Sequence, residues 1–431
     1  MDKKAVYIVD GKRTPFIKAA NPPGEFSGVD LAHSTCRQLL LEQPFTAKDL
    51  DEVVAGCVIP GADEANAARI LSLRLGCGKS VPAYTVQRNC ASGMQALDSA
   101  MKDIQLGRCD LVLAGGTEAM SRAPLMYGPE MVRWFSAMMQ ARTLKSRLLM
   151  LTKFRLKNLK PIVALILGLS DQTIGMNMGQ TAEELAYKFS ISRQEMDAFA
   201  LQSHQRVLQA QEQGLFEEIT PLVSNKGKVY DDDNGARADS SLERLARLKP
   251  MFDKKIGSVT PGNSSQITDG AAFMLLASKE AVQKYGLKVR AKIVDVAWSG
   301  VAPELMGLGP VHAIADILKA QDTSISDIDY WEINEAFAVQ VLACVKALAS
   351  DDYCQENLAS DKALGEIPQE KLNVFGGAIA QGHPVGASGA RIVLQLLNVL
   401  ERNDAQRGIA SLCIGGGQGG ALMIERTVGV K

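Results

Sequence analysis

The feature that most constrains the fold is a helix-and-strand pattern that occurs twice along the 431 residues. Ala-Ser-Gly at residues 91–93 opens a helix-like run, and a strand-like run that ends in glycine follows at residues 111–116. The same order recurs with Ala-Ser-Gly at residues 387–389 and a strand-like run at residues 409–417 that also ends in glycine. This repetition indicates two homologous halves of the βαβαβ type, related by a pseudo-two-fold axis.

Strand-like and helix-like runs alternate in both halves, which predicts an α/β fold with a mostly parallel sheet. Ligands of such sheets gather beyond the carboxyl ends of the strands, so two halves packed together could share one site. We expect strands at 5–9, 53–56, 83–86, 111–114, 291–296, 330–333 and 409–413, a turn or loop at 11–16, and helices at 28–42, 65–75 and 311–320.

An insertion between the repeated parts sets the domain organisation. The N-terminal half covers residues 1–117 and resumes at 256–290, and an inserted loop domain covers 118–255. The C-terminal half covers residues 291–431. A content of 46% hydrophobic and 22% charged residues is typical of globular proteins, so each part has enough apolar residues to bury a core.

Charge and cysteine usage exclude several classes of function. The net charge of −1 provides no overall field to attract nucleic acid. The eight cysteines form no CxxC pair, which argues against a disulfide framework and a metal site and predicts a reducing, cytoplasmic location. No signal-peptide core precedes the first strand, and the longest uncharged apolar run, residues 162–169, is too short to span a bilayer.

Residues 131–169 of the insertion are unusually basic. No acidic residue occurs between Glu130 and Asp171, whereas lysines, arginines and large apolar residues alternate through the segment. A basic amphipathic helix of this composition can lie on an anionic membrane surface or dock a partner protein. Two other readings are open: the apolar face closes the core of the insertion, or the cations meet substrate phosphates.

Cys90 is the first candidate for chemistry. It follows the strand at residues 83–86 and precedes a helix in which Met94, Leu97 and Met101 share one face. The free N–H groups and the dipole of a helix start favour an anion, so we expect a lowered pKa and a nucleophilic thiolate. A buried structural cysteine is the alternative.

Other polar groups occur at predicted strand ends. His383 lies in a glycine-rich loop before a helix and is suited to act as a general base. Cys413 precedes Gly415-Gly416-Gly417, whose N–H groups could bind an oxyanion. Asn334 could hold a water or cap a turn, and residues 261–265 form a polar turn suited to a ligand. We expect His204 to be a surface or packing residue.

Together these stretches resemble the thiolase family, in the family's order from end to end. The matching motifs are Asn89-Cys90-Ala91-Ser92-Gly93, Gly115-Gly116-Thr117-Glu118-Ala119-Met120-Ser121, Gly262-Asn263-Ser264-Ser265, Asp269-Gly270-Ala271-Ala272, Asn334-Glu335-Ala336-Phe337, Gly382-His383-Pro384 and Cys413-Ile414-Gly415-Gly416-Gly417. The resemblance implies the five-layered αβαβα thiolase fold and a homodimer or homotetramer.

The resemblance also implies a role for each motif residue. Cys90 is similar to the nucleophile that becomes acylated, and His383 is similar to its activating base. Cys413 is similar to a second thiol that acts first as an acid and later as a base. Asn334 would hold a water that, with His383, stabilises an enolate oxygen. The backbone N–H groups of Cys90 and Gly415 would bind the oxyanion of the tetrahedral intermediate.

Substrate contacts follow from the same resemblance. Arg237 and Ser265 are similar to coenzyme A contacts, and Met178 is similar to a residue beside the acyl chain. Coenzyme A and acetyl-CoA would be substrates, and no permanently bound cofactor is implied. The expected reaction is CoA-dependent cleavage of 3-ketoacyl-CoA, and the alternative is an acetyl-CoA C-acetyltransferase that makes or cleaves acetoacetyl-CoA.

The motifs combine features of two subfamilies. Residues 131–169 are similar to the insertion in β subunits of fatty-acid oxidation complexes, which implies an α-subunit partner, peripheral membrane contact and longer substrates. That subfamily carries His where this chain has Asn334, and Ala where it has Gly415; both positions resemble short-chain acetyltransferases instead. A decarboxylating ketoacyl synthase normally lacks the second cysteine, so Cys413 argues against it. Intact Cys90, His383 and Cys413 argue against a non-catalytic scaffold.

Overall fold

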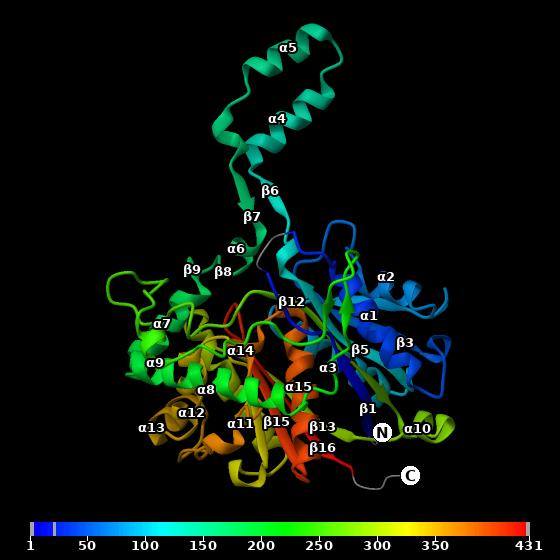
Figure 1. Cartoon of the computed structure of the whole chain (residues 1–431), viewed down its shortest axis with the longest axis vertical. Coiled ribbons are helices and arrows are strands. Elements are labelled where there is room, and N and C mark those ends of the chain that lie inside the picture. The colour runs from blue at the N-terminus through cyan, green and yellow to red at the C-terminus, as the bar shows by residue number, and fades with distance from the viewer. Residues whose placement is uncertain (1–3, 20–22, 428–431) are drawn as a thin grey trace.

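The computed structural model describes residues 4–19 and 23–427. Figure 1 shows a broad α/β body from which two helices project on a narrow two-stranded stalk. The body contains one ten-stranded sheet in the order β14-β15-β16-β13-β1-β12-β5-β3-β4, with the short β2 paired to β12. Strand β1 lies at its centre and pairs with β12 of the N-terminal half and with β13 of the C-terminal half.

The strands are β1 (Val6–Arg13), β2 (Ile17–Lys18), β3 (Glu52–Gly56), β4 (Ala83–Val86), β5 (Leu111–Ala119), β6 (Leu125–Tyr127), β7 (Pro161–Val163), β8 (Ser170–Asp171), β9 (Met176–Asn177), β10 (Leu222–Val223), β11 (Val229–Tyr230), β12 (Thr268–Ala277), β13 (Ala291–Gly300), β14 (Tyr330–Ile333), β15 (Arg407–Ile414) and β16 (Gln418–Arg426).

The α-helices are α1 (Gly28–Leu41), α2 (Ala67–Arg74), α3 (Ser92–Gln105), α4 (Pro129–Gln140), α5 (Leu144–Thr152), α6 (Ala164–Gly168), α7 (Met178–Lys188), α8 (Arg193–Glu212), α9 (Leu242–Ala246), α10 (Lys279–Tyr285), α11 (Gly309–Ala320), α12 (Ala338–Leu348), α13 (Asp351–Asn357), α14 (Ala378–Gln381) and α15 (Val385–Arg402). Short 3₁₀ helices lie at Ala47–Asp49, Met120–Arg122, Leu156–Leu159, Pro303–Leu308, Ile325–Asp327 and Gln369–Lys371.

The prediction of a mostly parallel sheet is wrong. Only the β3–β4, β3–β5 and β14–β15 pairs of the described sheet are parallel, and its other pairs are antiparallel. Helix crossovers produce the parallel pairs, whereas β15 and β16 are joined by a tight glycine turn that reverses the chain. A buried apolar run has the same composition in a parallel and in an antiparallel strand, so the sequence could not distinguish the two kinds of pairing.

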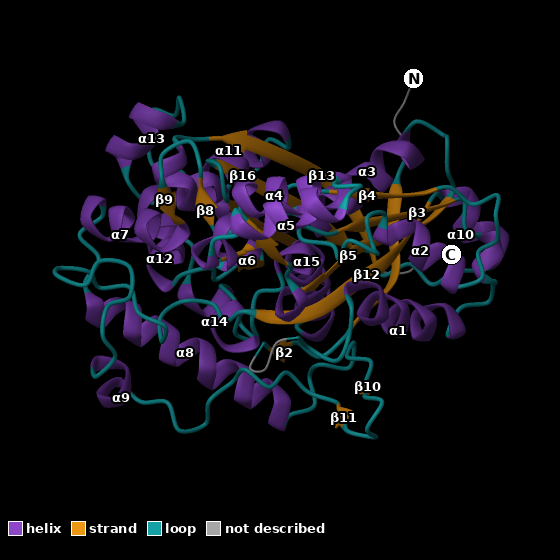
Figure 2. Ribbon diagram, turned by 90° about the horizontal axis from the view of Figure 1, so that it is seen from above, coloured by secondary structure: helices purple, strands orange, loops and turns teal. Residues whose placement is uncertain are grey.

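The layer order follows from alternation along the strands. In β5, Leu111 and Leu113 pack with α1 and α2, whereas Val112 and Ala114 pack with α3 and α15. In β15, Ile409 packs toward α11 and α12, whereas its neighbour Ala410 faces the same α3–α15 core. The resulting order is helices, sheet, helices, sheet, helices, and Figure 2 shows α1 and α2 on the side of the body opposite α7 and α12. The expected αβαβα arrangement is confirmed.

The two central helices touch through their glycines. A Cβ atom added at Gly93 of α3 would lie 2.9 Å from the backbone nitrogen of Ala390, and one at Gly389 of α15 would lie 2.6 Å from the nitrogen of Met94. Both distances are too short for a side chain, so only glycine permits this approach. The repeated Ala-Ser-Gly segments therefore meet at the pseudo-two-fold contact.

The basic segment forms a helical hairpin, not one amphipathic helix. Helix α4 ends at Gln140, and Thr143 starts the next helix, α5, with a hydrogen-bonded capping box. The chain turns between the two helices. The Trp134 ring packs edge-on against Phe154 at 5.0 Å, and its Nε1 donates to the Met150 carbonyl. The hairpin thus has a small core of its own, although many large apolar side chains, such as Met139 (86% exposed), stay in solvent.

Two smaller expectations also changed. Strand β1 continues through Gly11-Lys12-Arg13, where we expected a turn, because these residues stay paired with Met274, Phe273 and Ala272 of β12. Strand β5 likewise continues past its two glycines to Ala119. Over the described ranges, no helix combines the length and apolarity needed to cross a membrane.

Candidate active site

Cys90 lies in a tight turn between β4 and α3. Asn89 adopts a left-handed conformation (φ 44°), and its side chain Nδ2 donates to the carbonyl of Gly415 at 2.8 Å. Ser92 closes the turn, because its hydroxyl accepts from the Arg88 N–H and donates to the Asn89 carbonyl. The first thiol is therefore tied directly to the glycine turn that follows the second thiol, Cys413.

The glycine turn between β15 and β16 brings four predicted residues together. The backbone N–H groups of Gly415 and of Cys90 itself stabilise the Cys90 thiolate. A Cβ atom at Gly415 would lie 3.1 Å from the Met178 sulfur, so Met178 borders the same space. Cys413 is 1% exposed. Burial, with the nearby thiols of Cys90 and Cys344, raises its pKa well above the usual value.

The expected low pKa of Cys90 is wrong. Burial raises the pKa of this thiol to about 11, and the Glu118 carboxylate adds to the rise. The N–H groups of Gly415 and Cys90 oppose the shift but are outweighed. Helix α3 begins only at Ser92, so Cys90 gains less from the helix start than the sequence indicated. The resting sulfur is a thiol that needs a base.

His383, just before α15, is held as a neutral imidazole. Its Nδ1 lies 2.6 Å from the hydroxyl of Ser388, and that hydroxyl donates to the Pro384 carbonyl. The serine hydrogen is therefore used, so Nδ1 must be the donor and Nε2 keeps its lone pair. Burial, followed by the charge of Arg391, lowers the pKa of His383 to about 3. An imidazole in this state can accept a proton at neutral pH.

Asn334 faces that free nitrogen. Its Nδ2 lies 3.5 Å from His383 Nε2, and its Oδ1 accepts from Arg391 Nη2 at 2.9 Å. Its backbone N–H donates to the Ser411 carbonyl of β15, which fixes the end of β14 beside the Cys413 strand. Asn334 therefore lies between the base and the strand that carries the second thiol.

The polar turn at residues 261–266 lies between these elements. The Ser265 N–H donates to the Ala336 carbonyl at 2.9 Å, and the His383 N–H donates to the Gln266 carbonyl at 3.0 Å. A small pocket of about 100 Å³ opens beside the turn and is lined in part by Arg237 and His204. His204 is buried, and its Nδ1 accepts from the Arg237 N–H, so it is a packing residue and not a surface one.

Short contacts link the segments that carry Cys90, His383, Asn334 and Cys413. The starts of α3 and α15 adjoin, because a Cβ atom at Gly93 would lie 2.9 Å from the Gly386 carbonyl oxygen. Cys90 and His383 each lie two residues before one of these starts. Arg237 lines the small pocket, and Ser265 lies in the turn beside it, next to Gln266. This arrangement gathers two thiols, one neutral imidazole and several N–H donors in one region.

Three further residues join the site that sequence reasoning did not single out. Glu118 accepts hydrogen bonds from the N–H groups of Val58, Ile59 and Gly386, so it fastens the start of α15 to the loop after β3. Ser388 orients His383, and Arg391 holds Asn334. Arg391 had a signal in the sequence: it is the one charge in the apolar run from Ala390 to Leu397.

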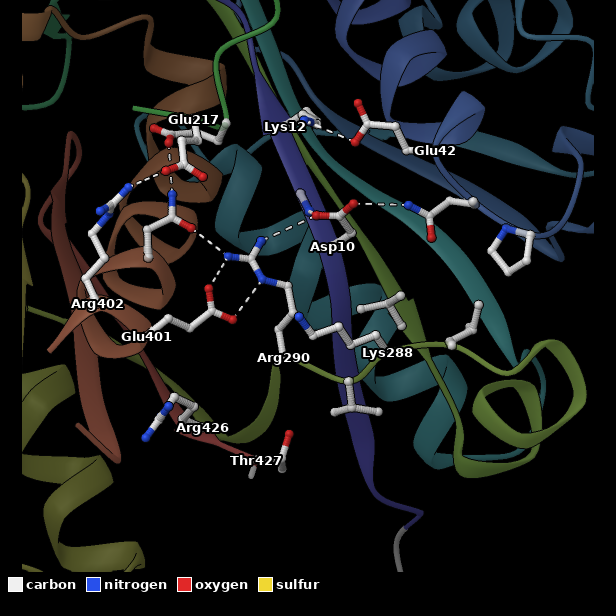
Figure 3. A pocket seen from close by; sticks show the side chains of 18 of the residues that line it. Asp10, Lys12, Glu42, Glu217, Lys288, Arg290, Glu401, Arg402, Arg426 and Thr427 are labelled. Atoms are coloured by element: carbon white, nitrogen blue, oxygen red, sulfur yellow. Dashed lines mark hydrogen bonds and ion pairs between the residues drawn. The ribbon is translucent and has the colours of Figure 1, made fainter. Parts of the chain in front are cut away.

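A wider pocket of about 1080 Å³ lies elsewhere, and Figure 3 shows its charged lining. Arg290 at its centre pairs with Glu401 and Asp10, and Lys12 pairs with Glu42. These charges neutralise one another, and no cysteine or histidine is among the described residues that line the pocket. Its size alone does not make it a reaction site.

Comparison with known proteins identifies the family. The model of the thiolase N-terminal domain matches residues 6–280, and that of the thiolase C-terminal domain matches residues 287–426. The β-ketoadipyl-CoA thiolase of Pseudomonas aeruginosa is 40% identical over 98% of this chain and 99% of its own. The β subunit of the bovine (Bos taurus) mitochondrial trifunctional enzyme is 36% identical over 97% of this chain and 88% of its own.

A solved structure agrees. Human mitochondrial 3-ketoacyl-CoA thiolase in complex with CoA superimposes with a TM-score of 0.85 and 36% identity, over 98% of both chains. The matches extend over both halves and include the segments that carry the two thiols and the imidazole. The chain therefore belongs to the thiolase family of acyltransferases.

Proposed function

We propose that this protein cleaves 3-ketoacyl-CoA with coenzyme A, which yields acetyl-CoA and an acyl-CoA shortened by two carbons. The observation that supports the proposal most directly is the joining of Cys90 to the Cys413–Gly415 turn through the Asn89–Gly415 hydrogen bond. A neutral imidazole at an adjoining helix start completes the set. A nucleophilic thiol with a base nearby suits acyl transfer through a covalent intermediate, and the second thiol can move the proton of the leaving carbon and of the incoming coenzyme A.

In the first step, His383 Nε2 takes the Cys90 proton as the sulfur attacks the 3-keto carbon. The raised pKa of Cys90 and the lowered pKa of His383 both oppose a resting ion pair, so proton transfer accompanies attack. The negative oxygen of the tetrahedral intermediate lies against the backbone N–H groups of Cys90 and Gly415.

In the second step, the C2–C3 bond breaks and its electron pair moves to C2 as the enolate of acetyl-CoA. The Cys413 thiol donates its proton to C2, and the shortened acyl group remains on Cys90 as a thioester. The enolate oxygen is stabilised by the imidazolium of His383 and by a water held at Asn334. Acetyl-CoA then leaves.

In the last step, the Cys413 thiolate removes the proton of incoming coenzyme A, and the CoA sulfur attacks the thioester carbonyl. The Cys90 sulfur leaves and regains its proton from His383. Every group returns to its starting state, so the reaction needs no bound cofactor. We assign to coenzyme A both Arg237, which lines the small pocket, and Ser265, in the turn beside it. We assign Met178, which borders the space at Gly415, to the acyl chain.

The direct test is a Cys90→Ala variant assayed for CoA-dependent loss of a 3-ketoacyl-CoA. We expect no thiolysis, no acyl-enzyme by mass spectrometry and an unchanged melting temperature. Cys109→Ala is the matched control, because Cys109 lies before β5, at the strand end opposite the site. Thiolysis that survives in the Cys90→Ala variant would exclude this function.

The runner-up activity is acetoacetyl-CoA synthesis or cleavage. Asn334 and Gly415 favour it, because these positions resemble short-chain acetyltransferases. Rates with 3-ketoacyl-CoAs of about four to sixteen carbons separate the two proposals. A maximum at four carbons supports the acetyltransferase, and a maximum at longer chains supports the degradative thiolase.

The helical hairpin supports a further proposal about partners. Residues 128–160 of this hairpin carry exposed apolar side chains and eight cations, and Glu130 is their one acidic residue. Such a surface suits an anionic membrane. The likeness to a trifunctional enzyme subunit beta also suggests an α-subunit partner. We propose a homodimer or homotetramer as the core assembly, to be measured by light scattering with and without the hairpin.

A further inference from the structure

We infer that Arg391 is a positioning residue for the proposed reaction, and that it acts by fixing which end of the Asn334 amide faces His383. The inference rests on the proposed function, because it concerns the step in which an enolate forms. Arg391 does not touch the reacting atoms, and its effect passes through Asn334.

A buried polar stripe on α15 supports the inference. Ser388, Arg391 and Gln395 follow one another at spacings of three and four residues, so they share one face of the helix. All three are at most 2% exposed, within a helix that is otherwise mostly apolar. Ser388 contacts His383, Arg391 contacts Asn334, and Gln395 donates to Glu332 at 3.0 Å. One helix face therefore sets two of the proposed catalytic side chains.

The guanidinium has few partners. Among the described residues, its one hydrogen bond is from Nη2 to Asn334 Oδ1 at 2.9 Å. The nearest carboxylate, on Glu332, lies 3.8 Å from Nη1, which is an ion pair without a hydrogen bond. A buried cation is costly unless it is paired and hydrogen-bonded, so this arrangement is poor as a device for stability. The guanidinium instead directs its single hydrogen bond to the amide oxygen of Asn334.

The charge at Oδ1 decides the orientation of Asn334. The amide carries an acceptor at one end and two donors at the other. Because a guanidinium is donor-only, a flipped amide would place N–H groups against N–H groups. Nδ2 must therefore face His383, where its N–H groups are available to the water or to the enolate oxygen. The cation also polarises the amide, which strengthens those N–H groups as donors.

Two acidic residues, Glu332 and Glu335, lie near Arg391. Glu332 accepts from Gln395 and lies 3.8 Å from Arg391 Nη1, and burial raises the pKa of this carboxyl to about 8. Glu335 is occupied by Ser203, Asn373 and the Ile379 N–H, so it does not compete for the guanidinium. Asn334 is left as the group that Arg391 orients.

The test compares two reactions of the same enzyme. Exchange of labelled coenzyme A into acetyl-CoA passes through the Cys90 thioester and forms no enolate, whereas thiolysis of acetoacetyl-CoA forms one. We expect Arg391→Met to lower kcat for thiolysis by about tenfold or more beyond any loss in exchange, with KM nearly unchanged. Arg391→Lys keeps a cation near Oδ1 and should restore part of the loss.

The controls separate this role from a structural one. Arg290→Met removes a different ion-paired arginine, which is partly buried in the pocket of Figure 3, and should leave the ratio of thiolysis to exchange unchanged. Equal losses of both reactions in Arg391→Met would overturn the inference, as would a Lys variant no better than Met.

If Arg391→Met does not fold, the Arg391→Lys and Asn334→Ala variants decide. Each should lower thiolysis more than exchange, and equal losses overturn the inference. A wild-type enzyme without thiolysis would instead contradict the proposed function.

Discussion

The Nδ1 atom of His383 lies 2.6 Å from the hydroxyl oxygen of Ser388, one helical turn into α15. Because that hydroxyl gives its hydrogen to the Pro384 carbonyl, it can only accept from the imidazole. The contact fixes the tautomer in which Nε2 is unprotonated and faces Asn334. A single serine therefore determines which ring nitrogen of His383 is free to accept a proton.

Replacing Ser388 by alanine should slow the reaction with little loss of stability. Without the acceptor, the imidazole can adopt the other tautomer and rotate, so fewer molecules present a free Nε2. We expect kcat/KM for thiolysis to fall about tenfold, while the free energy of unfolding falls by about 1 kcal/mol. Steady-state kinetics and urea unfolding measure the two effects.

Ser278→Ala is the matched control for that variant. Ser278 is also fully buried, but it caps α10 far from the site, with its hydroxyl accepting from the Ala281 N–H. It should cost about 1 kcal/mol of stability and leave kcat/KM unchanged. A Ser388→Ala enzyme with wild-type kinetics would show that the tautomer is held by something else.

The pKa of Cys90, about 11, predicts how the resting thiol reacts with an alkylating agent. Below that pH the thiolate fraction rises tenfold for each pH unit, so the rate with iodoacetamide should rise with a slope of about one between about pH 6 and 9. The same peptide in the unfolded chain should level off near its ordinary pKa of about 8.5. A plateau near about pH 7 in the folded protein would mean a preformed thiolate.

The low pKa of His383, about 3, predicts the acidic side of the activity profile. An ordinary histidine, with a pKa of about 6.5, would become protonated below that pH and lose its function as a base. Because the folded enzyme keeps the imidazole neutral, kcat/KM measured over the stable range should show no break near about 6.5. A break near about 6.5 would contradict the depressed pKa of His383. His204 would not explain such a break, because burial lowers its pKa to about 4.

Glu118→Gln should destabilise the junction between α15 and the loop after β3. One carboxylate accepts from the N–H groups of Val58, Ile59 and Gly386, and an amide would set its own N–H groups against at least one of them. We expect a loss of about 1 to 3 kcal/mol in chemical unfolding. Glu130→Gln, in an exposed ion pair with Arg133, should change stability by less than about 0.5 kcal/mol.

The hairpin can be removed without disturbing the body. Tyr127 of β6 pairs with Pro161 of β7, so an Asn-Gly turn can replace residues 128–160 and join adjacent strand ends. We expect this variant to keep thiolysis of short substrates and to lose binding to anionic vesicles. Binding of the intact protein should weaken as salt rises, because the eight cations are screened. Vesicle binding that is indifferent to salt would contradict the electrostatic part of the proposal.

The sequence by itself determined which residues are candidates for chemistry. The Cys90 turn, the glycine-flanked His383, the Cys413 strand end and the repeated Ala-Ser-Gly helix starts all follow from local composition and spacing. The repeat also indicated two halves that meet, and the Gly93 and Gly389 contacts bear this out. Such features are local, because turn glycines and helix starts depend on neighbouring residues alone.

Only the tertiary structure decided how those groups behave. The pKa of Cys90 rose because burial outweighed the helix start, and the direction of each strand depended on its connection and not on its apolar pattern. The Arg391–Asn334 contact joins residues 57 positions apart, and the Asn89–Gly415 bond joins residues 326 apart. Desolvation and charge pairing are sums over such distant neighbours, which no local pattern in the chain records.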